Sequence, residues 1–239
     1  MVDARALVAE WWPPAAVVVR TPRLELRWPS MDDLIALAAV AADGVHAEDR
    51  MPFYTPWTRG SAVERARNVL RWNWKGWGEW DPAKWSFGAV AVVDGVVVGT
   101  QGMQATDYAV CRTIETGSWL GLAHQGQGIG KEMRAAMLHL AFAGLDAEAA
   151  LTGAFSDNEA SLGVTRSLGY VENGSKLLSV EGRPARELLF TMDRATWESR
   201  RRDDITLEGV EAARPLFGLT GDDPSGSDAP EVEPPEPTG

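Results

Sequence analysis

The chain has 239 residues, with 23 Lys and Arg against 34 Asp and Glu, which gives a net charge of −11. This acidic balance disfavours nucleic acid as the main partner, because phosphate binding needs a basic face. The single cysteine, Cys111, excludes an intramolecular disulfide. No apolar run resembles a signal-peptide core or reaches the length of a membrane span, so we expect a cytoplasmic protein without a membrane partner.

Hydrophobic periodicity, capping residues and turn residues predict the elements of the first half in chain order. They are a short helix (3–12), one strand broken at Thr21-Pro22 (17–26), a helix capped by Ser30, a loop (43–60), and a helix from Ser61 to about Trp80. Two strands (85–93 and 96–106) then flank Asp94-Gly95, a pair that favours a tight hairpin because both turn positions need positive φ.

The second half is predicted in the same way to alternate between strands and helices. It contains a strand (112–122), a helix from Ile129 to Gly144, a strand (149–155), a helix (158–168), and a last hairpin (170–180 and 186–192). The fold class is therefore α/β (α+β), with a mixed central sheet of about seven strands flanked by helices.

The domain organisation predicted from this order is one domain, residues 13–195, between two extensions. Residues 1–12 form the N-terminal extension and residues 196–220 the C-terminal one. The remaining segment, 221–239, has six acidic residues, five prolines and no Lys or Arg. It has almost no apolar side chain to bury, so we expect a disordered acidic tail.

A glycine-rich turn between the strand 112–122 and the following helix carries the strongest functional signal. Glycines at 126, 128 and 130 leave a row of backbone N–H groups open at a helix N-terminus, an arrangement suited to a pyrophosphate. The dinucleotide fingerprint fails because its third glycine would fall on Lys131. The P-loop fails because Gln125 stands at its first glycine and Glu132 follows Lys131.

The pattern that fits is Gln125-x-x-Gly128-x-Gly130, which resembles the coenzyme A-binding motif of the GNAT acyltransferases. Downstream, Asn158-x-x-Ser161 and the ending Leu168-Gly169-Tyr170 resemble the RimJ/RimL-type branch, as does the opening at 20–26. The resemblance covers about residues 20–193. The segments 44–53, 117–122 and 214–218 are also similar to actinobacterial GNAT proteins proposed to bind succinyl-CoA.

The resemblance implies the GNAT fold, whose sheet splays at strands 4 and 5. It also implies transfer of an acyl group, acetyl by default and succinyl as the alternative, from acyl-CoA to a primary amine by direct attack in a ternary complex. Acyl-CoA would be the co-substrate, and no metal is expected, because the three His show no ligand spacing. The acceptor would be a small-molecule or protein amine, and a homodimer is a family-level expectation.

The same resemblance assigns the coenzyme-binding residues. Backbone groups of the splayed strand would bind the pantetheine arm and polarise the thioester, the turn would bind the pyrophosphate, and the next helix would touch the pantetheine region. The predicted residues are, in that order, Trp119, Leu120 and Leu122; Gln125, Gly126, Gln127, Gly128, Ile129, Gly130 and Lys131; and Asn158 with Ser161.

Two residues are candidates for catalysis. Glu115 lies four residues before Trp119, on the same face of the strand, and is a candidate general base; the alternative is a carboxylate in a structural hydrogen bond. Many GNAT enzymes have a Tyr acid at the position occupied here by Thr165, which is a poor acid. Ser161 stands where the RimJ/RimL branch has a serine thought to assist the thiolate; the alternative is a first-turn hydroxyl bonded to backbone.

Five tryptophans between 72 and 85 have two interpretations, a helix face packed on the sheet or an aromatic wall of the acceptor pocket.

Two further functions remain open from the sequence. One is a non-catalytic acyl-CoA sensor, favoured by Thr165. The other is a protein-interaction module, which the retained glycines of the turn argue against.

Overall fold

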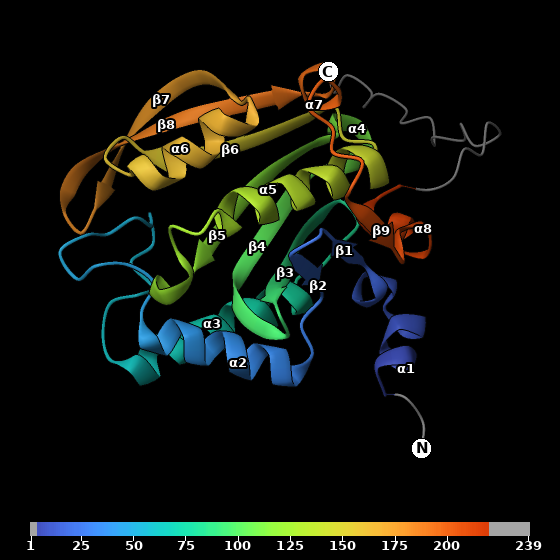
Figure 1. Ribbon diagram of the computed structural model, residues 1–239, viewed down its shortest axis with the longest axis horizontal. Coiled ribbons are helices and arrows are strands. Elements are labelled where there is room, and N and C mark those ends of the chain that lie inside the picture. Colours follow the sequence, from blue (N-terminus) through green and yellow to red (C-terminus); the bar gives the residue numbers. More distant parts are fainter. Residues whose placement is uncertain (1–3, 220–239) are drawn as a thin grey trace, which may run out of the picture.

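The computed structural model describes residues 4–219, which form one open sheet flanked by helices (Figure 1). The strand order is β7-β8-β6-β5-β4-β3-β2-β1-β9, and every neighbouring pair is antiparallel except β5 and β6. The strands are β1 (Val18–Arg20), β2 (Leu24–Arg27), β3 (Lys84–Val93), β4 (Val96–Thr106), β5 (Thr113–Leu120), β6 (Ala149–Phe155), β7 (Val171–Val180), β8 (Arg183–Asp193) and β9 (Thr206–Glu208).

The helices lie on both faces of this sheet (Figure 1). The α-helices are α1 (Ala4–Trp11), α2 (Met31–Asp43), α3 (Ala62–Gly78), α4 (Tyr108–Cys111), α5 (Ile129–His139), α6 (Glu159–Leu168), α7 (Arg194–Glu198) and α8 (Val210–Ala213). Short 3-10 helices are η1 (Pro13–Ala16), η2 (Leu122–His124) and η4 (Arg214–Phe217). The segment η3 (Leu140–Gly144) is a π-helical end to α5.

The sheet has nine strands among the described residues, so the expected number of about seven was wrong. The segment 17–26, expected as one strand, forms the antiparallel strands β1 and β2, in which Val19 lies opposite Leu26. The chain reverses at Thr21, whose N–H donates to the Leu24 carbonyl (2.9 Å) and closes the turn. The other extra strand is β9, whose three residues are too few to show an alternating pattern.

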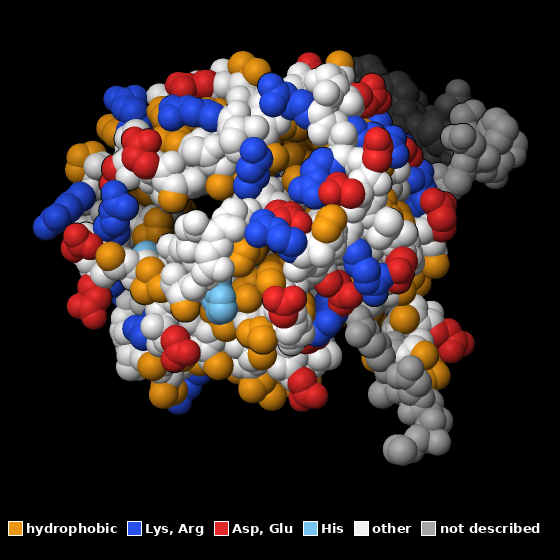
Figure 2. Space-filling view, in the orientation of Figure 1, with side chains coloured by type: hydrophobic (Ala, Val, Ile, Leu, Met, Phe, Trp, Pro, Cys, Tyr) orange, Lys and Arg blue, Asp and Glu red, His pale blue; other side chains and the backbone are white. Residues whose placement is uncertain are grey.

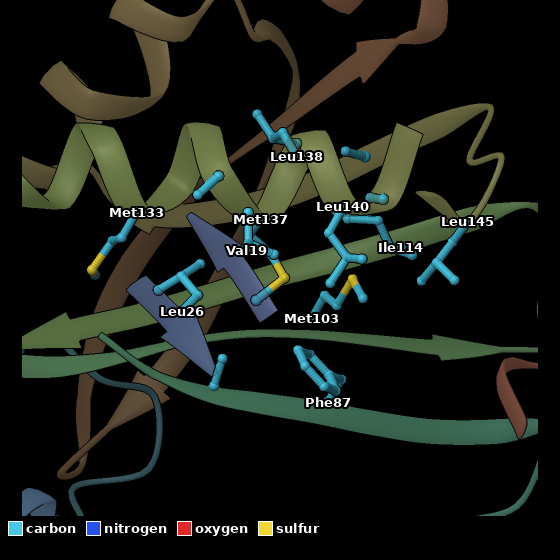
Figure 3. Packing of buried hydrophobic residues seen from close by; sticks show 14 of the residues in the cluster. Val19, Leu26, Phe87, Met103, Ile114, Met133, Met137, Leu138, Leu140 and Leu145 are labelled. Carbon is cyan, nitrogen blue, oxygen red and sulfur yellow. The ribbon is translucent and has the colours of Figure 1, made fainter. Parts of the chain in front are cut away.

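Alternating residues of the central strands build two hydrophobic layers. In β3, Phe87, Ala89 and Ala91 belong to the cluster beneath α5, whereas Val90 and Val92 pack beneath α2 and α3. Figure 3 shows the α5 side, where Met133 and Met137 of the helix and Leu140 of η3 point down onto the strands. A sheet covered on both faces gives the functional strands a rigid frame.

Local signals in the sequence explain several boundaries. Ser30 and Ser61 both form the predicted N-caps, each with a complete capping box. Asp94 and Gly95 have φ values of 49° and 79°, as the hairpin prediction requires. Cys111 ends the short helix α4 and is exposed.

The tryptophan-rich segment divides between the two interpretations. The indole N–H groups of Trp80 and Trp85 donate to the carbonyls of Leu216 (2.8 Å) and Phe217 (3.1 Å), so the C-terminal segment closes over the core. Phe217 is fully buried against both rings. Trp72 is 69% exposed and is therefore available to a ligand.

Two further expectations concern the acidic tail and membrane-spanning helices. The acidic tail, 221–239, lies outside the described residues. Within residues 4–219, none of the helices combines the length and the apolar character needed to cross a bilayer.

Candidate functional site

The expected splay lies between β5 and β6. The two strands pair in parallel over only three residues, Thr113 to Glu115 on β5 and Ala149 to Leu151 on β6. Both strands then continue, to Leu120 and Phe155, while remaining paired with β4 and β8 on their outer sides. Their inner edges therefore diverge and leave backbone groups for another partner. Figure 2 shows a hollow on this face, between α6 and the turn that precedes α5.

The glycine-rich turn sits at the open end of this splay. Gly126 and Gly128 have φ values of 72° and 79°, which favour glycine, and Gly128 is the N-cap of α5 without a side-chain cap. In the described part of the chain, no acceptor is recorded for the N–H groups of 126–128. The first-turn amides of α5 also lack intrahelical partners, so the turn presents a row of donors to an anion.

The other predicted residues of the turn have mainly structural contacts. The Gln125 side chain donates to the carbonyls of Val45 (2.7 Å) and Leu120 (2.9 Å), and the Gln127 side chain donates to that of Ala123 (2.9 Å). Their side chains thus hold the turn in shape. The side chains of Leu120 and Ile129 are buried, so only their backbone faces a ligand, whereas Leu122 and Lys131 are exposed.

The turn is anchored by a buried carboxylate that sequence analysis missed. Glu132 is 6% exposed, accepts a hydrogen bond from Thr21 Oγ1 (2.6 Å) and forms an ion pair with Arg23 (2.5 Å). Arg23 also donates to the Gln127 carbonyl (3.3 Å), which brings a cation beside the anion-binding turn. Burial by itself raises the pKa of Glu132, but the hydrogen bonds from Thr21 and Arg23 prevail and lower it.

This lowered pKa predicts a pH dependence of stability. The carboxylate of Glu132 stabilises the fold above its ordinary pKa, and that contribution is lost as the pH falls through the lower folded value. We therefore expect the free energy of unfolding of wild type to fall more steeply than that of Glu132→Gln between about pH 5 and about pH 3, measured by urea unfolding. A difference between the two proteins that does not change with pH would contradict this role.

The start of α6 brings together the next predicted residues. The Asn158 Oδ1 atom caps the helix by accepting the N–H of Ser161 (3.2 Å), which leaves the Asn158 amide nitrogen for other partners. Within residues 4–219 no hydrogen bond of the Ser161 hydroxyl is recorded, so the backbone-bonded alternative finds no support. Thr165 is 1% exposed and its hydroxyl has no hydrogen-bond partner among residues 4–219, so it is in no position to replace an exposed acid.

Glu115 marks the closed end of the splay, because it belongs to the last pair of β5 and β6. It is exposed and accepts a hydrogen bond from Gln104 Nε2 (3.1 Å). It opens into a cleft of about 1030 Å³ that also includes Trp72, Glu79 and Leu151. None of the predicted coenzyme residues lines this cleft, so the cleft and the glycine-rich turn are separate parts of the candidate site.

Trp119 belongs to an aromatic group that connects the splay to the loop 43–60. The ring centroids of Trp119 and Trp57 are 5.4 Å apart, and those of Trp57 and Phe53 are 5.2 Å apart. The loop reaches further, because Arg50 donates to the Asp157 carbonyl (3.2 Å) and Arg59 pairs with Glu181 (2.8 Å). The loop therefore bridges from β5 to the β6–α6 connection and the β7–β8 hairpin.

A buried arginine lies on the α5 side of the splay. Arg134 is 4% exposed and donates to Gln101 Oε1 (3.3 Å), Thr152 Oγ1 (3.0 Å) and Ser118 Oγ (3.0 Å). Sequence analysis missed it, although a basic residue next to Met133 in an otherwise apolar helical stripe was a usable signal. Among residues 4–219, no group of three or more His, Cys, Asp or Glu side chains is arranged to hold a metal ion.

Comparison with known families decides the assignment. Residues 23–171, more than half of the chain, match the model of the acetyltransferase (GNAT) domain. The chain belongs to the GNAT acetyltransferase family. It is thereby placed among the acyl-CoA-dependent N-acyltransferases, and the fold with its splayed β5 and β6 is the GNAT fold.

Solved GNAT structures share this architecture at low sequence identity. Mycobacterium smegmatis RimJ in complex with CoA-disulfide is 19% identical, with a TM-score of 0.62, covering 79% of this chain and 97% of that one. RimL, a ribosomal L7/L12 α-N-protein acetyltransferase in complex with coenzyme A, is 19% identical, with a TM-score of 0.59 and coverage of 74% and 97%. A GNAT-family acetyltransferase from Bacillus anthracis is 18% identical, with a TM-score of 0.59 and coverage of 74% and 99%. At these identities the likeness establishes the fold alone.

Proposed function

We propose that this GNAT protein transfers an acyl group, acetyl by default, from acyl-CoA to a primary amine by direct attack in a ternary complex. The observation that carries the proposal is the coincidence of two features at one place. The inner edges of β5 and β6 are unpaired beyond Glu115 and Leu151. The amide-rich turn at 126–128 stands at the open end of the same gap.

In this proposal the coenzyme lies along the gap. Its pyrophosphate accepts hydrogen bonds from the N–H groups at 126–131, and its pantetheine arm pairs with the free edge of β5 near Trp119 and Leu120. The Asn158 amide nitrogen and the Ser161 hydroxyl contact the pantetheine from α6. The thioester then lies toward the closed end of the splay, where Glu115 stands.

The acceptor enters from the other side of the sheet, through the cleft that contains Glu115. An amine attacks only in its neutral form, so Glu115 serves as general base, directly or through a water molecule. Trp72 and Leu151 give this cleft apolar walls, and Glu79 adds a second carboxylate. We propose a small-molecule amine or a protein N-terminus as the acceptor class, in a cytoplasmic protein that is able to form a homodimer.

Two alternatives have particular observations in their favour. The segments 44–53, 117–122 and 214–218 favour succinyl-CoA as the donor. The buried, unpartnered hydroxyl of Thr165 favours a non-catalytic acyl-CoA sensor, because the usual acid is missing.

The experiment is calorimetric titration with acetyl-CoA, succinyl-CoA and free coenzyme A, followed by measurement of thiol release in the presence of an amine panel. We expect one acyl-CoA to bind more tightly than free coenzyme A and to release thiol only when an amine is present. Binding without amine-dependent release would support the sensor. Absence of binding by all three would overturn the proposal.

A further inference from the structure

Arg134 carries a positive charge in an enclosed, neutral environment. Within residues 4–219 its guanidinium donates to an amide oxygen of Gln101 and to the hydroxyls of Ser118 and Thr152, contributed by β4, β5 and β6. None of the ion pairs recorded within residues 4–219 includes this guanidinium. The nearby phenol of Tyr170 is not a counter-ion, because burial raises its pKa and keeps it neutral.

Such an arrangement is costly for folding alone. A buried cation loses its hydration, and neutral acceptors return only part of that loss. Where packing is the only requirement, an apolar side chain of similar length fills the space at lower cost. A buried charge without a recorded ion pair at this depth therefore indicates a functional requirement.

The position of the Arg134 guanidinium indicates a role at the splay between β5 and β6. Ser118 and Thr152 lie beyond the last paired residues of β5 and β6, on opposite sides of the splay. Arg134 thus spans the gap from beneath. Beside it, the hydroxyl of Thr152 donates to the Thr116 carbonyl (3.2 Å), and that of Thr116 donates to the Leu151 carbonyl (3.3 Å). Side chains on the α5 face therefore replace the interstrand ladder where it stops.

We propose that Arg134 is a positioning residue of the transfer site, which holds β5 and β6 apart and places a fixed positive charge beneath the gap between them. This inference rests on the proposed function, since the gap is where the thioester would lie. As the amine nitrogen bonds to the thioester carbon, the carbonyl electron pair moves onto oxygen. That pair then re-forms the carbonyl as the C–S bond breaks, the bonding pair of the C–S bond leaves on sulfur, and the proton lost by the amine ends on the thiolate.

Negative charge therefore appears first on oxygen and then on sulfur, both in the gap above Arg134. A preorganised cation stabilises both species without reorganising during the reaction. It also reduces the need for a proton donor at the position of Thr165, because the thiolate leaves beside a positive charge. The charge acts through its place in the frame and makes no direct contact with the substrate in this proposal.

The test compares Arg134→Met, which keeps length and removes charge, with Arg134→Lys, which keeps charge. Arg65→Met is the matched control, because Arg65 on α3 is also partly buried and donates to the neutral backbone carbonyls of Ala41 (3.1 Å) and Ala42 (2.6 Å), on the face of the sheet opposite α5. For each protein we would measure kcat, KM, calorimetric affinity for acyl-CoA, and Tm.

We expect Arg134→Met to lower kcat on the order of 10- to 100-fold, with acyl-CoA affinity within about threefold and an equal or higher Tm. Arg134→Lys should recover part of kcat, and Arg65→Met should keep the wild-type kcat. The inference fails if Arg134→Met turns over at the wild-type rate, or if its loss of kcat comes with a lower Tm that Arg134→Lys does not restore. Wild type that binds no acyl-CoA or releases no thiol would instead overturn the proposed function.

Discussion

Replacing Glu115 by glutamine should lower kcat by about 100-fold or more while leaving acyl-CoA affinity within about twofold. Glutamine has nearly the same shape and still accepts the hydrogen bond from Gln104, so the strand should keep its geometry. What it loses is the ability to take a proton from the acceptor ammonium, which must become a neutral amine before it attacks. Steady-state kinetics with calorimetric binding of acyl-CoA separates these effects, because the coenzyme residues do not line the cleft of Glu115.

The matched control for this prediction is Glu79→Gln. Glu79 is another carboxylate of the same cleft, and its recorded ion pair is the distant one with Lys75 (3.8 Å). Its replacement should leave kcat within about twofold, since exposed pairs of this kind contribute little. Equal loss in both variants would assign the effect to the overall charge of the cleft. Wild-type turnover by Glu115→Gln would leave Glu115 as a structural carboxylate held by Gln104.

The parts of the site that were predictable from sequence are those set by local backbone chemistry. The anion-binding turn depends on glycines at fixed spacing, and the φ values at Gly126 and Gly128 are the direct consequence of that pattern. Asn158 is also a local feature, because its side chain caps the helix that follows it. The family resemblance supplied the rest, namely the splay and its place between the strands now seen as β5 and β6.

The unpredicted parts depend on contacts between distant segments. Arg23 reaches the turn from the β1–β2 connection, 109 residues before its partner Glu132. Phe217 is 132 residues from Trp85, whose indole N–H donates to its carbonyl, and the three-residue β9 is formed by pairing with β1. No periodicity or cap marks such contacts, because each segment becomes ordered only when the other is present.

Replacing Gly128 by valine should weaken acyl-CoA binding by about 100-fold or more, since losing two charge-assisted hydrogen bonds is worth about 3 kcal/mol or more. Gly128 has a φ of 79°, and a β-carbon there would lie 3.5 Å from Arg23 Nη2. A branched side chain would twist the turn away from its left-handed conformation, cover the amides at the start of α5 and displace the neighbouring guanidinium.

Gly95→Val is the control that isolates binding from backbone strain. Gly95 has the same φ of 79°, lies in the β3–β4 hairpin, and has no atom within 4 Å of an added β-carbon. Both variants should therefore lose a similar amount of stability, on the order of 1–2 kcal/mol, which thermal or urea unfolding measures. Only Gly128→Val should lose affinity for acyl-CoA and for free coenzyme A alike, because the lost contacts are those to the pyrophosphate that both ligands share. Equal binding by the two variants would remove the turn at 126–130 from the coenzyme site, whereas a selective loss for the acyl form would move its role from the pyrophosphate to the thioester.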